Sequence, residues 1–198
     1  MRELIEKEAK KESLEIPKDK LDKLERFANK LEWWNKIHNI TGAKTKEKIV
    51  ANIIDSLIPI SFIKEPKSML DVGTGAGFPG LILAIMWSNA KVVLAEPLNK
   101  RASFLRYIVE DLELKNTTIF KDRVENLQHP PFELVTSRAV TNTKLLLDLT
   151  KNVTSKDTKY LFFKGERVYQ EIEELKAQYI YDIVTKNRRN YLLIKGRV

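Results

Sequence analysis

The sequence predicts an α/β fold, with a mainly parallel sheet of seven strands that ends in an antiparallel hairpin and follows an N-terminal helical segment. Three observations support this fold class. Residues 1–63 carry apolar side chains at helical spacing, residues 64–198 alternate short apolar runs with helical patterns, and a glycine-rich turn follows the first of these runs. We therefore expect a helical extension over residues 1–63, packed on a core domain formed by residues 64–198.

The helical segment shows its pattern most clearly where apolar residues recur on one face, at Leu21, Leu24, Ala28 and Leu31. Residues 39–42 end in glycine, which is a helix stop signal. A second helix is predicted over residues 46–62, and Pro66 closes the helical segment before the first strand.

The glycine-rich turn belongs to the stretch Asp71-Val72-Gly73-Thr74-Gly75-Ala76-Gly77-Phe78-Pro79-Gly80, in which two ligand-binding patterns overlap. The pattern beginning at Gly75 matches the dinucleotide fingerprint, and the pattern beginning at Asp71 matches the acid–glycine pattern of S-adenosylmethionine enzymes. A dinucleotide site needs its first glycine directly after the strand. The predicted strand ends near Val72, so the pattern starting at Gly73 is in register, with Phe78 where the third dinucleotide glycine belongs. We also place Pro79 in the first helical turn, where it removes a donor for a pyrophosphate. The turn therefore favours S-adenosylmethionine, with a dinucleotide oxidoreductase as a lower-ranked alternative.

The remaining elements follow in alternation. Strands are predicted near residues 92–95, 117–120, 132–136 and 160–163, and helices at 99–112, 145–149 and 168–178. Two final strands, 179–184 and 191–195, face each other across residues 187–190 and are typical of a hairpin. A parallel sheet that ends in an antiparallel pair is the arrangement of the Rossmann-like S-adenosylmethionine-dependent methyltransferase fold.

Polar residues at the carboxyl ends of the strands are the candidate site residues, because ligands in open α/β sheets bind there. Glu96 ends the second strand, where a carboxylate accepts hydrogen bonds from both ribose hydroxyls. Arg138 ends the fourth strand and is expected to hold the methionyl carboxylate or a phosphate. Alternatively, Glu96 is simply a charge at a helix N-terminus, and Arg138 is a surface residue that pairs with a nearby acid. The predicted cofactor-binding residues are Gly73, Gly75, Gly77, Phe78, Glu96, Val124, Glu125 and Arg138, and the predicted catalytic residues are Ser137 and Arg138.

Charge and composition restrict the partners and the chemistry. The chain of 198 residues has a formal net charge of +8, no cysteine and two histidines. These counts exclude a cysteine nucleophile and argue against a metal site. Residues 183–198 carry basic side chains and no acid, which favours a surface that contacts phosphates over a merely lysine-rich one. The predicted RNA-binding residues are Lys100, Arg101, Arg123, Lys164, Arg188, Arg189 and Arg197.

The target atom is restricted by what the chain lacks. Methylation of a pyrimidine at C5 needs a cysteine nucleophile, whereas guanine N7 has a lone pair and no proton to remove. Pro130-Pro131-Phe132 is similar to a motif of enzymes that methylate exocyclic amines, but it precedes the fourth strand instead of following it. A direct in-line transfer, without a covalent enzyme intermediate, is consistent with the residues present.

From about residue 31 to 173 the chain resembles the bacterial 16S ribosomal RNA guanine-N7 methyltransferases, also called glucose-inhibited division protein B. The likeness lies in Trp34-Asn35, Asn39-Ile40-Thr41, Asp55-Ser56-Leu57, the stretch 71–80, Glu96-Pro97, Lys100-Arg101, Phe104-Leu105, Arg123-Val124-Glu125, Thr136-Ser137-Arg138-Ala139 and Lys164-Gly165. The resemblance implies methyl transfer from S-adenosylmethionine to N7 of a guanine in the decoding region. It also implies cofactor contacts at Gly73, Phe78, Val124, Glu125 and Arg138. One departure is Asn52, where the family usually has histidine, so that only a hydrogen-bonding role would survive at this position.

The expected partner is small-subunit ribosomal RNA or a ribosomal particle. Alternatives are a small-molecule or protein methyltransferase, and a non-catalytic RNA-binding assembly module. No apolar run is long enough to span a membrane and the N-terminus has no signal-peptide pattern, so we expect a cytoplasmic protein without membrane or metal partners. We expect it to act as a monomer.

Overall fold

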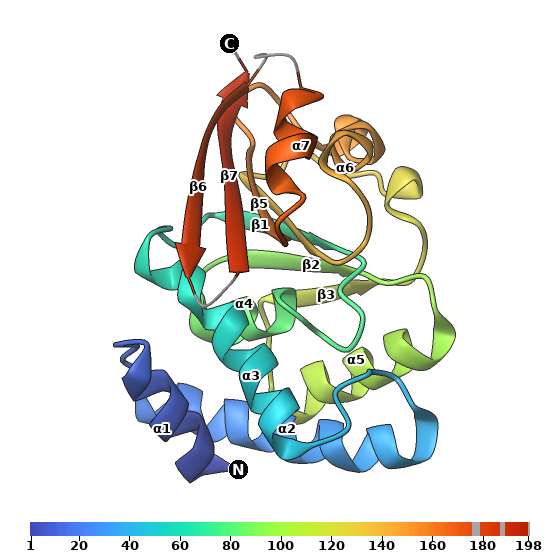
Figure 1. Ribbon diagram of the computed structural model, residues 1–198. Coiled ribbons are helices and arrows are strands. Elements are labelled where there is room, and N and C mark those ends of the chain that lie inside the picture. The colour runs from blue at the N-terminus through green and yellow to red at the C-terminus, as the bar shows by residue number, and fades with distance from the viewer. Residues whose placement is uncertain (176–178, 187–188, 198) are drawn as a thin grey trace.

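The computed structural model describes residues 1–175, 179–186 and 189–197 and shows a seven-stranded sheet with helices on both faces (Figure 1). The strand order is β3-β2-β1-β4-β5-β7-β6. The parallel strands are β1 (Ser68–Val72), β2 (Lys91–Ala95), β3 (Thr117–Phe120), β4 (Leu134–Arg138) and β5 (Lys159–Lys164). The antiparallel pair is β6 (Tyr179–Lys186) and β7 (Arg189–Arg197). The predicted fold class is confirmed.

Helices precede the sheet and connect its strands. The extension consists of α1 (Arg2–Lys11), α2 (Lys18–His38), α3 (Lys46–Leu57) and the short 3₁₀ turn η1 (Ile58–Ser61). The connecting helices are α4 (Gly80–Met86), α5 (Asn99–Asp111), α6 (Thr143–Leu149) and α7 (Val168–Glu173), with 3₁₀ turns η2 (Val124–Asn126) and η3 (Lys151–Val153). Over the part of the chain that the structure describes, no helix has the length and apolar character needed to cross a membrane.

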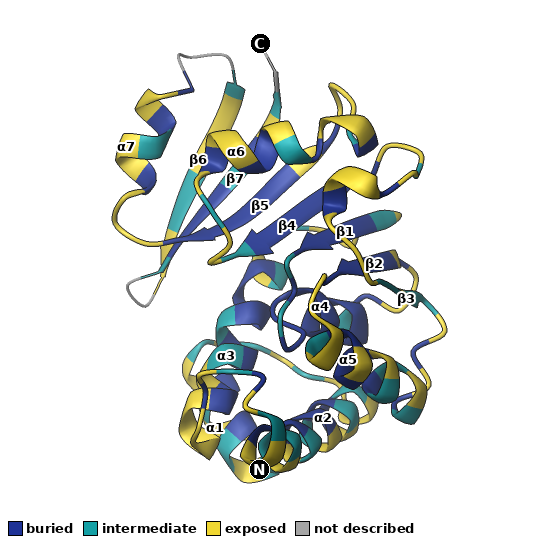
Figure 2. Ribbon diagram, turned by 90° about the vertical axis from the view of Figure 1, so that its right-hand side faces the viewer, coloured by how far each residue is buried: buried dark blue, intermediate teal, exposed yellow. Residues whose placement is uncertain are grey.

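Two hydrophobic cores cover the two faces of the sheet, because successive residues of a strand point to opposite sides. Val92 and Leu94 of β2 join the core beneath α1 to α5, whereas Val93 and Ala95 join the core beneath α6 and α7. Figure 2 shows these two groups of helices on opposite sides of a buried sheet. The strands β2 and β5 are buried on both faces after their first residue, as expected for parallel strands between helical layers.

The helical extension shares the first of these cores. The ring of Phe27 in α2 packs edge-on against Phe78 of the glycine-rich turn at 5.4 Å, and against Phe104 of α5 at 6.3 Å. The division into units 1–63 and 64–198 stays a prediction, since α1, α2 and α3 contribute to the same continuous core as the sheet.

Several predicted boundaries were wrong by a few residues. Strand β4 begins at Leu134 instead of residue 132, because the backbone N–H of Phe132 donates to Val153 O outside the sheet. Pro79 precedes α4 instead of lying in its first turn, since the helix begins at Gly80. Helix α7 ends at Glu173, and the rest of its predicted range includes residues 176–178, which lie outside the described residues. Arg189 and Asn190 belong to β7 instead of a turn, because they pair with β6.

Candidate functional site

Strands β1 and β4 are neighbours in the sheet. The strands that follow β1 in the chain, β2 and β3, lie on one side of this pair, and β5 lies on the other, so the strand order reverses between β1 and β4. Ligands of open α/β sheets bind at such a switch point, beyond the carboxyl ends of the strands. A cavity of about 560 Å³ lies there. It is lined by Gly73, Thr74, Gly75, Ala76 and Phe78 after β1, Glu96, Pro97, Leu98 and Arg101 after β2, Arg138, Ala139 and Val140 at β4, and Ile40, Thr41 and Gly42 from the extension.

Gly75 leaves room for a ligand in this cavity. Its backbone has φ +61°, and a Cβ placed there would meet no atom within 4 Å. Gly77 also has positive φ, at +102°, but a Cβ there would lie 3.0 Å from the side chain of Leu81. Gly75 is therefore open to the cavity, whereas Gly77 is required for packing of the turn against α4 and does not line the cavity.

Glu96 is fixed beside the glycine-rich turn. Its side chain is 2% exposed, and its carboxylate accepts hydrogen bonds from the backbone N–H groups of Gly75 at 2.9 Å and Leu98 at 3.0 Å. Arg101 Nη1 lies 3.9 Å from Glu96 Oε2. The carboxylate is thus held in one orientation at the cavity wall, where a ribose contact was predicted.

Arg138 lies on the opposite side of the cavity. Its guanidinium is 4.9 Å from the centre of the Phe78 ring, and its Nη1 donates to Asn52 Oδ1 and Asp55 Oδ2, each at 3.1 Å. Asn52 therefore serves as a hydrogen-bond acceptor, which is the role that an amide can fill at this position. Burial lowers the pKa of Arg138, but the neighbouring Asp55 carboxylate opposes this change.

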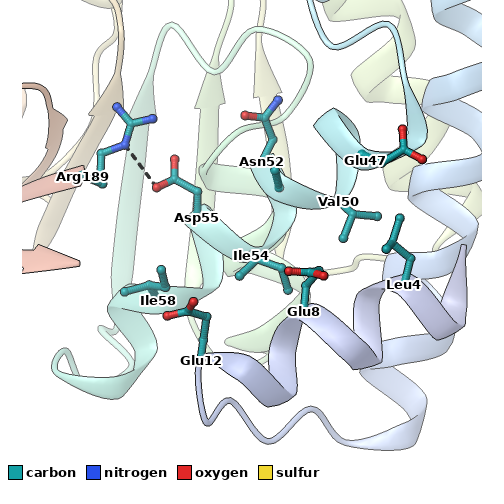
Figure 3. A pocket seen from close by; sticks show the side chains of 11 residues that line it. Leu4, Glu8, Glu12, Glu47, Val50, Asn52, Ile54, Asp55, Ile58 and Arg189 are labelled. Atoms are coloured by element: carbon teal, nitrogen blue, oxygen red, sulfur yellow. Dashed lines mark hydrogen bonds and ion pairs between the residues drawn. The ribbon is translucent and has the colours of Figure 1, made fainter. Parts of the chain in front are cut away.

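Asp55 joins α3 to two distant strands, β4 and β7. Besides Arg138, it accepts hydrogen bonds from Arg189 Nε at 3.1 Å and from the Tyr191 hydroxyl at 2.8 Å. The ion pair with Arg189 is drawn in Figure 3. Burial and the Asp55 carboxylate together raise the pKa of Tyr191, so the tyrosine stays a neutral donor. Asp55, which belongs to α3 and not to the sheet, thus fixes the orientation of the Arg138 side chain in the cavity.

A larger cavity of about 640 Å³ lies between α1 and α3 on the far side of Asp55 (Figure 3). Glu8, Glu12 and Glu47 line it, and none of the glycine-rich turn does. A wall of carboxylates repels the phosphates of a nucleic acid. We therefore take the smaller cavity, at the strand ends, as the candidate site.

Not every predicted cofactor residue lines the candidate cavity. Val124 is buried at the start of η2, and neither it nor Glu125 contributes to the wall, although both follow β3 at the same edge of the sheet. Ser137 Oγ donates to Val72 O at 3.0 Å, so its proton is used within the sheet. The roles proposed for these three residues stay predictions.

The loop from α2 to α3 was missed as part of the cavity wall. The Asn35 side chain accepts from Thr41 N at 2.9 Å and donates to Ala43 O at 3.3 Å, and Arg101 Nε donates to Ile40 O at 3.1 Å. In the sequence, Asn35 and Asn39-Ile40-Thr41 stand out only through the likeness to the family, and no local pattern indicates that this loop lines a cavity. A long-range contact of this kind leaves no periodic signal in the sequence.

The predicted RNA-binding residues fall into distinct groups. Lys100 and Arg123 are exposed near the carboxyl ends of β2 and β3, and Arg101 is 38% exposed. The Lys164 side chain is 8% exposed, so it does not form part of a surface that contacts phosphates. It can still contact a ligand inside a cavity. Arg189 is occupied by Asp55.

Two further basic residues of that prediction have no described side chain. Arg188 lies outside the described residues, and only the backbone of Arg197, in β7, is described. Among residues 1–175, 179–186 and 189–197, no three histidine, aspartate or glutamate side chains gather so as to hold a metal ion.

Asp71, at the end of β1, is fully buried behind the glycine-rich turn. Its Oδ2 accepts from Gly80 N at 2.8 Å, and a Cβ on Gly80 would come within 2.5 Å of this carboxylate. Burial raises the pKa of Asp71 to about 7, against the opposing effects of hydrogen bonds and of the Arg138 charge. Because the pKa is higher in the folded state, stability is fully present below the unfolded pKa near 3.8 and is lost as the pH rises through 7.

We therefore expect the free energy of unfolding to fall between pH 5 and 7.5 by roughly 2 to 3 kcal/mol more in the wild type than in Asp71→Asn. The amide keeps an acceptor for Gly80 N and does not titrate. Urea denaturation of both proteins at several pH values measures this difference. Parallel pH profiles of the two proteins would contradict it.

Comparison with known proteins places the fold and the site in context. The family model described as GidB, rRNA small subunit methyltransferase G, matches residues 20–195. A protein named ribosomal RNA small subunit methyltransferase G from Aliarcobacter butzleri is 47% identical over 172 residues, which cover 87% of this chain and 88% of that protein. A protein of the same name from Wolinella succinogenes is 45% identical, covering 89% of this chain and 90% of that protein.

Solved structures with low sequence identity share the fold. A methyltransferase from Geobacter sulfurreducens has a TM-score of 0.63 at 14% identity, covering 86% of this chain and 88% of that one. A structure described as a putative S-adenosyl-L-methionine-dependent methyltransferase from Methanococcus maripaludis has a TM-score of 0.61 at 14% identity, covering 86% and 92%.

Proposed function

Because this chain belongs to the rRNA small subunit methyltransferase G family and is an S-adenosylmethionine-dependent methyltransferase, we propose that it methylates N7 of a guanine in the decoding region of 16S ribosomal RNA. Because the proposed substrate is ribosomal RNA, we expect the protein to act in the bacterial cytoplasm. We expect it to work as a monomer and without a metal ion.

The observation that carries the proposal is the open backbone at Gly75 between the fixed side chains of Glu96 and Arg138. Three features support the proposal: the missing Cβ at Gly75 leaves space for a nucleoside, the Glu96 carboxylate at the cavity wall can accept from ribose hydroxyls, and the Arg138 guanidinium can bind a carboxylate. These residues fit S-adenosylmethionine. When bound there, the cofactor supplies a methyl group that its sulfonium sulfur releases as the lone pair of the acceptor atom forms the new bond.

We expect the residues of the chain to act by positioning the reactants. Guanine N7 has no proton to lose, so the site needs no general base, and a fixed geometry accounts for much of the catalysis. Arg138 is held against Phe78 by Asp55 and Asn52, which restricts it to one place at the end of β4. This arrangement supports direct transfer without a covalent enzyme intermediate.

Incubation with labelled S-adenosylmethionine and 30S particles or 16S RNA from cells lacking the gene tests the proposal. We expect label in N7-methylguanine at one position of the decoding region. A labelled protein or small molecule, with unlabelled RNA at every stage of assembly, would instead support the alternative methyltransferases. Absence of cofactor binding in calorimetry would support the non-catalytic assembly module.

The exposed cations near the site are expected to contact the RNA backbone. Replacing Lys100 and Arg123 together with alanine should weaken RNA binding and lower the slope of log K against log salt by about 1 to 2, because each phosphate contact contributes roughly 0.7 to 0.9. Cofactor affinity should not change. Filter binding over a salt series measures the slope.

A matched pair of lysines at the opposite ends of the strands provides the control. Lys91 begins β2 and Lys159 begins β5, and both are exposed. The double variant Lys91→Ala, Lys159→Ala removes the same charge, and we expect a wild-type slope from it. Equal slopes for the two double variants would show that net charge, and not this surface, governs RNA binding.

A further inference from the structure

Besides the candidate cavity and the acidic cavity between α1 and α3, a further cavity of about 480 Å³ lies beyond the carboxyl ends of β4 and β5. We call it the second cavity, because it adjoins the candidate cavity. Among its lining residues are Ser137, Ala139, Phe163, Lys164, Glu171 and Arg189. Ala139 lines both this cavity and the candidate cofactor site, and the consecutive residues Ser137 and Arg138 each face one of them. The end of β4 is therefore the shared wall, and the second cavity adjoins the candidate cofactor site.

Lys164 is the buried cation of this second cavity. It is the last residue of β5 and its side chain is 8% exposed. Its Nζ donates to Thr141 O at 3.1 Å and to Glu171 Oε2 at 2.7 Å. A lysine ammonium has three N–H donors, and among the described residues no third acceptor is bonded to it. Nζ also lies 5.6 Å from the centre of the Phe162 ring, which is a weaker contact than a hydrogen bond, so one donor remains for a ligand.

Glu171 of α7 is an anchored acceptor beside this lysine. Its Oε2 accepts from Lys164 Nζ, from Thr143 N at 2.7 Å and from Thr143 Oγ1 at 2.6 Å. Within the described part of the chain, Oε1 receives no hydrogen bond. Burial raises the pKa of Glu171, but the hydrogen bonds from Lys164 and Thr143 outweigh burial and the pKa is lowered. The carboxylate is thus an ion with one oxygen fixed and the other available.

On the premise of the proposed function, we propose that this cavity binds the target guanine and that Lys164 and Glu171 read its O6 and N1 positions. Guanine presents an acceptor at O6 next to a donor at N1. The remaining N–H of Lys164 pairs with O6, and the open oxygen of Glu171 accepts the N1–H. Adenine has an amino donor in place of O6 and a bare N1, so each contact would be reversed and left unpaired. N7 takes part in neither contact and stays free to accept the methyl group.

The anchoring of Glu171 makes its amide variant informative. In Glu171→Gln, the three donors at Oε2 keep the amide oxygen there, so the amide nitrogen takes the place of Oε1. A donor then faces N1. This donor opposes the N1–H of guanine and suits the bare N1 of 2-aminopurine, which keeps N7 but lacks both O6 and the N1 proton.

The test compares kcat/KM for 30S particles reconstituted with guanine or 2-aminopurine at the target position. We expect the wild type to prefer guanine by about 100-fold or more, since a site built for a polar contact rejects an analogue that lacks it. Glu171→Gln should lose about 100-fold on guanine, and its preference should shrink or reverse. Glu173→Gln removes the same charge from an exposed position of α7 and should keep the wild-type ratio. Cofactor affinity should be the same in all three proteins.

The outcomes separate this inference from the proposed function. A wild type that methylates guanine N7 but accepts 2-aminopurine equally well would overturn the reading of O6 and N1, without need of any variant. A Glu171→Gln enzyme that is slower but keeps the wild-type preference would show that Glu171 only supports the fold. A wild type that yields no N7-methylguanine in any particle would overturn the proposed function and this inference with it.

Discussion

Replacing Asp55 with alanine is expected to lower the free energy of unfolding by about 3 to 5 kcal/mol and to remove most of the methyltransferase activity. The Asp55 carboxylate contacts Arg138, Arg189 and Tyr191, and the Arg138 side chain is only 13% exposed. Without this carboxylate, the guanidinium is a buried charge that keeps its hydrogen bond to the neutral Asn52 amide and its contact with the Phe78 ring but has lost its ion pair. Breaking a buried ion pair by removing one side has a cost of this size.

Denaturant titration and methyl-transfer assays measure the two effects of Asp55→Ala. Glu47→Ala is the matched control, since Glu47 is an exposed carboxylate in the first turn of the same helix. We expect this control to lose much less stability than Asp55→Ala, because an exposed carboxylate loses only its interaction with the helix N-terminus. Similar losses in both variants would mean that Asp55 acts as an ordinary helix residue and does not hold the site.

Gly75→Val is expected to abolish measurable binding of S-adenosylmethionine, with an affinity loss of at least about 100-fold. The new side chain would project into the candidate cavity, where no atom lies within 4 Å of the added Cβ. The positive φ adds a strain of roughly 1 to 2 kcal/mol, so the fold should survive. Isothermal calorimetry measures the affinity, and circular dichroism checks the fold.

Gly165→Val provides the comparison for this experiment. A Cβ at Gly165 also meets no atom within 4 Å, but Gly165 lines the second cavity instead of the first. This variant should bind the cofactor normally and lose RNA methylation. A folded Gly75→Val protein with wild-type affinity would place the cofactor away from the glycine-rich turn.

That several predicted residues lie around one cavity could be expected from the sequence, because this depends on local sequence and on sheet geometry. Gly73, Gly75 and Phe78 lie in one turn, and Glu96 and Arg138 follow apolar strands. Parallel strands bring their carboxyl ends to one edge, so residues that are far apart in sequence meet there by a general rule. Only the register of the turn had to be decided.

The remainder of the site depends on contacts that no local pattern reports. The bond from Arg189 to Asp55 spans 134 residues and that from Arg138 to Asp55 spans 83. Lys164 was predicted among the RNA-binding residues, but its side chain is only 8% exposed. Its burial follows from Glu171, which comes from a short helix whose extent was itself predicted too long.

The bonds of Asp55 also bear on how the protein is made. At translation rates of roughly 5 to 20 residues per second, the carboxylate of α3 leaves the ribosome on the order of 10 s before Arg189 and Tyr191 are synthesised. Until then the nascent chain lacks the β7 partners that fix this carboxylate. The hydrogen bonds of Asp55 are therefore completed only when the last strand of the sheet has been synthesised.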